Sequence, residues 1–398
     1  MPENKNYNKT LYACFVGYII QAIINNFAPL LFLTFQSSYH IPLSQITLLV
    51  TANFGLQLII DFLSAGFIDK IGYRLSMLAA HVFCAAGLLL MTFLPNILPD
   101  AFTGLFLSVM VYAVGGGLLE VLVSPIVENC PTDNKEKAMS LLHSFYCWGH
   151  VGVVLLSTLF FRLFGIENWR ILAIVWAVVP ICNFFLFMTA PIAEPAKEQE
   201  GGLSVKKLVS RKIFWILMLL MLCAGSCEQA VSQWASTFAE KGLGISKTAG
   251  DLAGPMLFAI LMGTSRLIYG KWGDKFDLDK FMRFSGFLCL FSYLVISLSL
   301  HPVLGLLGCG LCGLSVGILW PGAFSMAAAN IPGGGTAMFA FLALAGDLGC
   351  MGGPTFVGFI SGAFDDNLKI GILAAVIFPL LLLAGLCAKN AICNRQKP

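Results

Sequence analysis

The feature that most constrains this chain is a series of twelve long apolar segments. A helix needs about 20 apolar residues to cross the hydrocarbon core of a bilayer, and the segments reach roughly that length. Backbone in lipid must satisfy its own hydrogen bonds, and strands would alternate polar and apolar residues, so we expect helices. The segments cover residues 11–36, 43–68, 75–94, 101–128, 138–164, 168–190, 213–238, 248–272, 281–300, 302–329, 336–364 and 367–389.

Composition agrees with a membrane protein. The 398 residues are 58% hydrophobic and 11% charged, whereas soluble domains carry about 25% charged residues. A soluble globular fold is therefore excluded, and we predict an all-α membrane protein with twelve transmembrane helices. The net charge of +3 comes from scattered basic residues, so no nucleic-acid partner is expected.

Lysine and arginine predict the orientation. If both termini are cytoplasmic, 18 of the 24 Lys and Arg residues lie on the inner side and 5 on the outer side, with Arg266 inside a helix. This bias is the one that the positive-inside rule describes. We therefore predict an integral protein of the plasma (cytoplasmic) membrane with both termini in the cytoplasm. The first apolar segment is too long for a signal-peptide core and is expected to remain as an anchor.

The chain divides at a charged stretch and repeats itself on either side. Residues 191–212 form the only long charged linker, between a predicted six-helix bundle at 1–190 and a second at 213–398. Ser124-Pro125 and Trp320-Pro321 occupy matching places in the two halves, at an offset near 200 residues. Such parallel repeats predict two six-helix bundles related by pseudo-two-fold symmetry.

Small residues and cysteines are interpreted as packing elements. Cys309-x-x-Cys312 lies in an apolar glycine-rich run without a histidine partner, so we expect no metal site and no cofactor. The spacings Gly349-x-x-x-Gly353 and Gly358-x-x-x-Gly362 predict close helix packing. No phosphate-binding loop or nucleophile elbow is present, so an enzyme is not predicted.

A charged loop motif then suggests a family. Asp69, Lys70, Gly72 and Arg74 resemble the loop between helices 2 and 3 of the major facilitator superfamily, and Gly270 with Asp274 resembles a second copy. The resemblance implies a twelve-helix transporter in which Asp69, Arg74 and Asp274 act in gating. An acid at a helix end accepts hydrogen bonds from another helix N-terminus. For Asp69 the implied partner is the helix that follows Gly333–Gly335.

Within that superfamily the chain resembles the fucose-permease-like sugar transporters. The run Gly115-Gly116-Gly117-Leu118-Leu119-Glu120, and Leu142-His143-x-Phe145 with Gly149, carry this resemblance. It implies that Glu120 takes part in sugar and proton handling. Asn25-Asn26 is followed by Phe27, where that group places an acid.

Polar residues within the apolar segments predict a shared aqueous cavity. An ionisable group in mid-membrane costs about 2.5–3.5 kcal/mol on insertion scales, and counting along each helix places these groups at similar depth. Gln229 and Gln233 are four residues apart, with Trp234 beside them. Amides, acids and flat aromatic faces suit a polyhydroxylated ligand. The ionisable candidates are Asp61, Glu120, His143, His150, Glu228, Arg266 and Asp347.

Two sets of site residues follow. The predicted substrate contacts are Asn25, Asn26, Glu120, His143, Tyr146, Trp148, Gln229, Gln233 and Trp234. The predicted coupling or gating residues are Glu120, Glu228, Arg266, Asp61, Asp347, Asp69, Arg74 and Asp274.

Some roles stay open at this point. Arg266 is neutralised by Glu120, Glu228 or Asp347, either to stabilise one conformation or to couple proton entry to movement. His143 and His150 either pack or take part in the site.

The function that these features favour is secondary active transport by alternating access. The predicted partners are a small-molecule substrate, a sugar or polyol, a coupling proton or sodium ion, and membrane lipid, and the protein is expected to be a monomer. An exporter of amphipathic drugs or metabolites is a second interpretation, because the 33 Phe and 14 Met residues allow it. A non-transporting membrane sensor or scaffold is a third, from another class.

Overall fold

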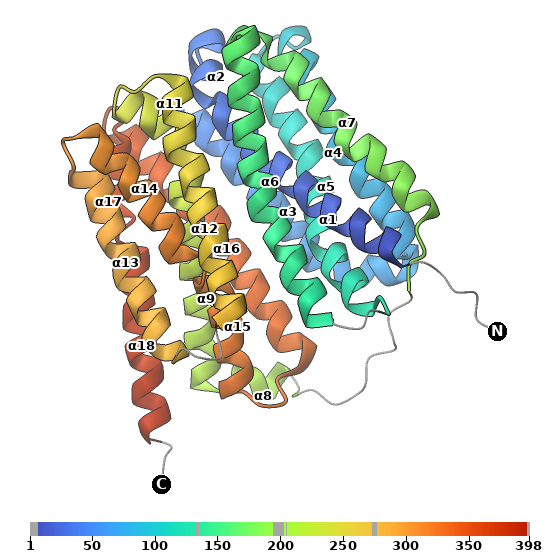
Figure 1. The fold of residues 1–398 in the computed structure, drawn as a ribbon, viewed down its shortest axis with the longest axis vertical. Helices are drawn as coiled ribbons and strands as arrows, with labels where there is room; N and C mark the ends of the chain where they lie inside the picture. The colour runs from blue at the N-terminus through green and yellow to red at the C-terminus, as the bar shows by residue number, and fades with distance from the viewer. Residues whose placement is uncertain (1–6, 132–134, 194–202, 204, 273–276, 396–398) are drawn as a thin grey trace. The chain divides into compact units, whose positions relative to one another are not determined.

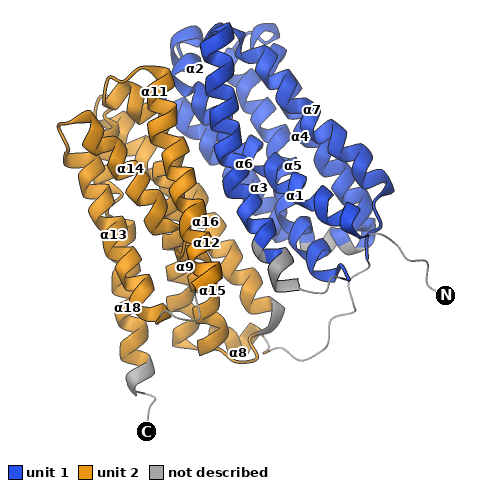
Figure 2. Ribbon diagram, viewed as in Figure 1, with its two compact units in different colours: residues 1–198 blue, residues 199–398 orange. Residues whose placement is uncertain are grey.

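The computed structural model describes residues 7–131, 135–193, 203, 205–272 and 277–395. Within this part every regular element is helical and no strand occurs. The chain forms two compact units, residues 1–198 and residues 199–398, which Figure 2 shows in different colours.

Unit 1 consists of long helices and three short elements (Figure 1). The first span is interrupted at Pro29 by a short 3₁₀ turn, because proline lacks an N–H group for the helical ladder. The elements are α1 (Asn8–Asn26), η1 (Ala28–Leu31), α2 (Phe32–Tyr39), α3 (Leu43–Ile71), α4 (Tyr73–Ile97), α5 (Ala101–Asn129), α6 (Lys135–Phe164), η2 (Ile166–Asn168) and α7 (Trp169–Thr189).

Unit 2 has more interruptions. Two of its short elements, η3 and η4, are π-helical turns. The elements are α8 (Val205–Val209), α9 (Lys212–Ser232), α10 (Ala235–Thr237), η3 (Phe238–Gly242), α11 (Lys247–Asp251), η4 (Leu252–Met256), α12 (Leu257–Trp272), α13 (Leu278–Leu298), α14 (Pro302–Val316), α15 (Leu319–Asn330), α16 (Gly335–Ala363), α17 (Leu368–Ala374) and α18 (Ile377–Arg395).

Twelve helical stretches of the described chain are long and apolar enough to span a membrane, which confirms the predicted number. The structure adds detail at their ends. Beyond Ser232 the seventh stretch continues only through α10 and the wide turn η3. The short helix α8 lies inside the stretch predicted as a linker, and α9 begins at Lys212.

Glycines bring α9 and α16 into close contact, as the spacing of Gly349 and Gly353 predicts. A Cβ atom on Gly353 would lie 2.6 Å from the carbonyl oxygen of Ser226, and one on Gly349 would collide with the carbonyl of Leu222. Only residues without a side chain allow backbones to approach this closely. The prediction for Gly362 is wrong, because a Cβ there meets no heavy atom of the described chain within 4 Å.

Large apolar side chains face outward along the helices. On α7, Ile171, Ile174, Val178 and Phe185 are 47% or more exposed. Their spacing of three to seven residues places them on one side of the helix. A soluble protein rarely exposes such a continuous apolar surface, and a lipid surrounding accounts for it.

Candidate functional site

Unit 1 buries a chain of side-chain amides between α1 and α3. Gln21 and Asn25 come from α1, Asn53 and Gln57 come from α3, and none is more than 5% exposed. Gln57 Nε2 donates to Asn25 Oδ1 at 3.0 Å and to Asn53 Oδ1 at 2.9 Å, and Asn53 Nδ2 donates to Asn25 Oδ1 at 3.0 Å. Each amide has both donors and acceptors, so this chain complements hydroxyl groups.

The amide chain ends on an acid of α5. Gln21 Nε2 donates to Gln57 Oε1 at 2.9 Å and to Glu120 Oε2 at 3.2 Å. The preceding glycine run makes room for this contact. A Cβ atom on Gly116 would lie 3.2 Å from Gln57 Cδ, and one on Gly117 would lie 2.9 Å from the Cβ of Ile60 on α3. The glycines therefore admit the amides between α3 and α5.

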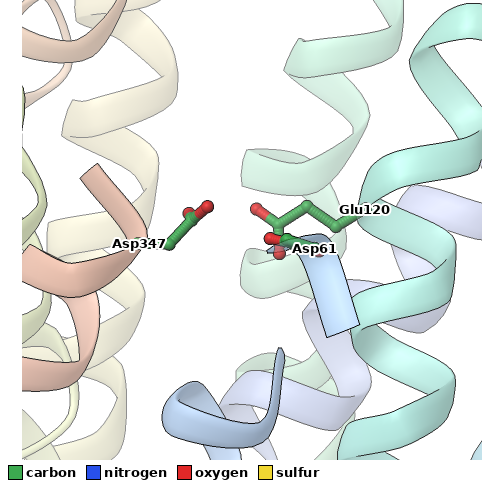
Figure 3. Close-up of side chains that lie close together, drawn as sticks. All are labelled: Asp61, Glu120 and Asp347. Atoms are coloured by element: carbon green, nitrogen blue, oxygen red, sulfur yellow. The ribbon is translucent and has the colours of Figure 1, made fainter. Parts of the chain in front are cut away.

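A second acid of unit 1 lies beside Glu120. Carboxylate oxygens of Asp61, on α3, and Glu120, on α5, lie within 4.8 Å of each other, and Figure 3 shows the two side chains meeting. Two ionised carboxylates at this separation repel each other, and a bound proton or cation relieves the repulsion. Asp347, which Figure 3 also draws, is a residue of α16 in unit 2 and is 9% exposed.

The aromatic residues of α6 divide by burial. His143 is exposed, and its ring centroid lies 5.5 Å from that of Tyr18, whose hydroxyl is 3.0 Å from Ser124 Oγ. Tyr146 is half-buried and the indole of Trp148 is 42% exposed. His150, in contrast, is only 2% exposed. The structure thus places His143 against α1, and the interpretation of His150 as a packing residue agrees with its burial.

Unit 2 carries a comparable chain that ends on an ion pair. Gln233 Nε2 donates to Gln229 Oε1 at 3.1 Å, and Gln229 Nε2 donates to Glu228 Oε1 at 3.3 Å. Arg266 of α12 donates from Nη2 to Glu228 Oε2 at 3.3 Å. Among the three acids that the sequence leaves as partners for Arg266, Glu228 therefore pairs with it within unit 2. Burial in a low-dielectric surrounding strengthens such a pair.

Two predicted ligand contacts use their donors on backbone. Asn26 Nδ2 donates to the carbonyl of Ala22 in its own helix at 2.9 Å. Trp234 is fully buried, and its indole N–H donates to the carbonyl of Pro354 at 2.9 Å. The Asn26 bond lies within α1, whereas the Trp234 bond joins the segment after α9 to α16.

Arg74 binds the end of a helix. Its guanidinium donates to the carbonyls of Phe187 at 2.7 Å, Met188 at 2.9 Å and Ala190 at 2.7 Å. The last carbonyls of a helix lack intrahelical partners and carry a partial negative charge, so Arg74 caps α7. The side chain of Asp69 and the whole of Asp274 lie outside the described residues.

A charged cluster lies where the seventh and eighth stretches meet. Lys247 Nζ is 3.1 Å from Glu240 Oε1 and 3.0 Å from Asp251 Oδ2, and it donates to Ser236 Oγ at 3.0 Å. Burial raises the pKa of Glu240, and the nearby charge of Lys247 opposes this rise. Asp251 is fully buried, which is tolerated because its oxygens are paired and hydrogen-bonded.

Comparison with known families decides the class of this protein. The model of the Major Facilitator Superfamily matches residues 13–354, which is most of the chain. The chain belongs to the major facilitator superfamily. As a superfamily member it is an integral membrane protein of transporter fold, and a small-molecule substrate and surrounding lipid follow from that family.

Solved structures of other superfamily members share the fold at low identity. A crystal structure of the E. coli fucose:proton symporter FucP has a TM-score of 0.66 and 15% identity, and the match covers 97% of this chain and 99% of that chain. A bacterial homologue of the human lysosomal transporter Spinster, in an inward-facing and occupied conformation, has a TM-score of 0.77 and 14% identity, with 98% of each chain covered. A comparison with curated protein sequences gave no match.

Reasoning from the sequence missed three members of the amide network in this superfamily member: Gln21, Asn53 and Gln57. A signal for them exists. Gln21 and Asn25 are four residues apart, as are Asn53, Gln57 and Asp61, and this spacing places polar groups on one face of an otherwise apolar helix. The same four-residue spacing predicts Gln229 and Gln233 as site residues of unit 2.

Proposed function

We propose that the protein is a secondary active transporter that moves a sugar or polyol by alternating access, coupled to a proton or cation. The observation that carries the proposal is the amide chain of Asn25, Asn53, Gln57 and Gln21, which ends on Glu120. Uncharged amides suit a neutral, hydroxylated solute, because each hydroxyl both donates and accepts a hydrogen bond. A charged substrate would instead require unpaired charged side chains.

Residue roles follow from this arrangement. In unit 1, Asn25 and Asn26 are proposed to contact the solute together with His143, Tyr146 and Trp148. In unit 2, the proposed contacts are Gln229, Gln233 and Trp234. Glu120 and Asp61 are proposed to bind the coupling proton or sodium ion, since carboxylate oxygens suit both. The ion pair of Glu228 with Arg266, and Asp347, Asp69, Arg74 and Asp274, are proposed to control conformational change.

Support from outside the site is of a general kind. The fucose:proton symporter, a structural neighbour, is named for a sugar and a proton, which agrees with the proposal. The bias of Lys and Arg supports a plasma-membrane protein with both termini in the cytoplasm. We also propose a monomer.

Uptake into liposomes tests the function. The purified protein is reconstituted, and uptake of radiolabelled D-glucose, D-galactose, L-fucose and D-mannitol is measured with and without an inward proton or sodium gradient. We expect one of these solutes to accumulate only when a gradient is present. Glu120→Gln is expected to abolish accumulation, because the amide binds no coupling ion. Unchanged uptake and unchanged gradient dependence in this variant contradict the coupling role of Glu120.

The same liposomes separate the other interpretations. If hydrophobic cations are carried and protect the purified protein against heat while sugars do not, the protein is an exporter of amphipathic compounds. If no solute of either class exchanges across the membrane, a sensor or scaffold is the better interpretation.

A further inference from the structure

Gln21 occupies a junction between the proposed ion site and the proposed ligand contacts. Its single side-chain nitrogen donates to Glu120 Oε2 on one side, at 3.2 Å, and to Gln57 Oε1 on the other, at 2.9 Å. Gln57 in turn donates to Asn25 Oδ1 at 3.0 Å. One continuous path of hydrogen bonds therefore runs from the acid on α5 through α1 and α3 to a predicted ligand contact.

The hydrogen bonds of this path diverge from Gln21. Gln21 acts as donor toward both neighbours, and Gln57 acts as donor toward Asn25 and Asn53. An ionised carboxylate accepts hydrogen bonds and donates none. The orientation of the Gln21 amide is thus the one that an ionised Glu120 requires.

One atom of Gln21 does not fit a purely structural role. Gln21 is 2% exposed, and its Oε1 has no hydrogen-bond partner among the described residues. A buried acceptor without a donor costs about 1–3 kcal/mol. When Glu120 is protonated, its O–H group can donate one hydrogen bond. Gln21 Oε1 is an acceptor for this bond, because it belongs to the amide that already contacts Glu120.

We propose that Gln21 is a positioning residue that transmits the protonation of Glu120 to Asn25 through Gln57. A hydronium ion transfers one proton to a Glu120 oxygen: an O–H bond of the hydronium breaks, a water molecule is left, and an O–H bond forms on Glu120. This O–H donates to Gln21 Oε1. The Gln21 amide shifts to accept this bond, and its N–H bond to Gln57 changes with it. No other covalent bond forms or breaks. The position of the Gln57 amide then depends on whether Glu120 is protonated. The position of Asn25 Oδ1, the acceptor that faces the solute in this proposal, depends on it too.

The surroundings of Glu120 in unit 1 bear on this proposal. Within unit 1, a carboxylate oxygen of Asp61 on α3 lies within 4.8 Å of one of Glu120, so Asp61 competes for the proton. Tyr18 of α1 contacts Ser124, one turn further along α5, and His143 of α6 lies against Tyr18. Cys84 of α4 faces Gly115, at the start of the glycine run.

The inference rests on the proposed transport function, and a variant of Gln21 tests it. Gln21→Met keeps the length of the side chain and removes both hydrogen bonds. The solute is whichever of D-glucose, D-galactose, L-fucose and D-mannitol the wild-type protein accumulates. We expect Gln21→Met to lower proton-driven accumulation of this solute at least tenfold more than it lowers exchange in counterflow.

A matched control removes another buried amide that ties α1 to a neighbouring helix. Asn183 is 2% exposed, donates to the carbonyl of Ala13 at 3.0 Å and lies 2.8 Å from His81 Nε2, and neither of these partners belongs to the path. Asn183→Leu is expected either to lower counterflow and accumulation by the same factor or to leave both unchanged. If Gln21→Met behaves in that way, or accumulates solute like the wild type, the proposal is wrong.

A second readout needs no solute. In infrared spectra, the carboxylic C=O band of protonated Glu120 is identified as the band that Glu120→Gln removes. We expect Gln21→Met to change the proton concentration at which this band titrates by about threefold to tenfold, as the loss of a hydrogen bond predicts. An unmoved titration overturns the proposal. If the wild-type protein accumulates no solute, the proposed function fails, and this band still decides the role of Gln21.

Discussion

Arg266 and Glu228 form an ion pair inside unit 2, with Arg266 Nη2 at 3.3 Å from Glu228 Oε2. Both side chains are largely buried, at 18% and 9% exposed. The pair links α12 to α9, and Gln229 bonds the same carboxylate. A carboxylate that is held by a base and an amide is fixed in position, and the chain of Gln233 and Gln229 is fixed with it.

Removal of one member of this pair should destabilise the protein. Glu228→Gln leaves Arg266 as a buried charge without its acid, and we expect a loss of about 1–3 kcal/mol, below the ~3–5 kcal/mol for fully buried pairs. The double variant Glu228→Gln with Arg266→Met should be at least as stable as either single variant. Thermal unfolding in detergent measures this. Lys280→Ala is the control, because its pair with Asp277 is exposed; a greater loss there than in Glu228→Gln would contradict the expectation.

Close packing of α9 against α16 predicts a contrast between neighbouring glycines. Gly349→Ala places a methyl group against the carbonyl of Leu222 and should cost about 1–3 kcal/mol through overpacking. Gly352→Ala, three residues on, meets no heavy atom of the described chain within 4 Å. It should be neutral or stabilising by up to about 1 kcal/mol, because alanine favours helix. Melting temperatures of the two variants test the contrast, and equal values would refute it.

The charged cluster of unit 2 predicts a pH dependence of stability. The pKa of Glu240 is raised above its ordinary value of 4.5, and burial is the largest cause. Its contribution to stability is therefore present below that value and is lost as pH rises through the higher pKa of the folded state. Glu240→Gln does not titrate, so its melting temperature relative to wild type should increase between about pH 4 and pH 7.

Asp100 supplies the control for this experiment. Hydrogen bonds from Thr103, first from its side chain, lower the pKa of Asp100 below its ordinary value of 3.8. Its contribution is present above 3.8 and is lost only as pH falls further. The difference in melting temperature between Asp100→Asn and wild type should thus stay constant between about pH 4 and pH 7, where that of Glu240→Gln increases. Parallel behaviour of the two variants would rule out the burial of Glu240 as the cause.

The amide network of unit 1 predicts an effect on transport affinity. Asn25→Leu removes an acceptor that Gln57 and Asn53 both use and removes a proposed ligand contact. We expect KM for solute uptake to rise about tenfold, which corresponds to about 1.4 kcal/mol. Asn183→Leu removes a buried amide elsewhere in unit 1 and should leave KM unchanged. A KM like that of wild type in Asn25→Leu would exclude Asn25 from the ligand site.

The number and approximate ends of the spans could be predicted because hydrophobic length is a local property of the sequence. The interruptions were harder. Pro29 marks the break after α1, but nothing in Phe238–Gly242 distinguishes a π-helical turn from an ordinary one. The widened turn depends on how the packed neighbours hold the backbone, and composition does not record it.

The candidate site was predicted in part for the same reason. Glu120, Glu228 and Arg266 stand out because a charge in an apolar segment is rare. Gln21 and Gln57 are neutral and less conspicuous, although their spacing to other polar residues was visible. The pairing of Arg266 depends on the rotation of α12 against α9, which no single segment determines.

The two π-helical turns, at Phe238–Gly242 and Leu252–Met256, hold one more residue than an α-helical turn would. A single-residue deletion at either place would restore a regular helix without disturbing the register of the segments on both sides. Length differences of one residue between this chain and its relatives are therefore expected to gather at these turns. An alignment that forces such gaps elsewhere would shift Gln229 or Arg266 out of phase with their counterparts.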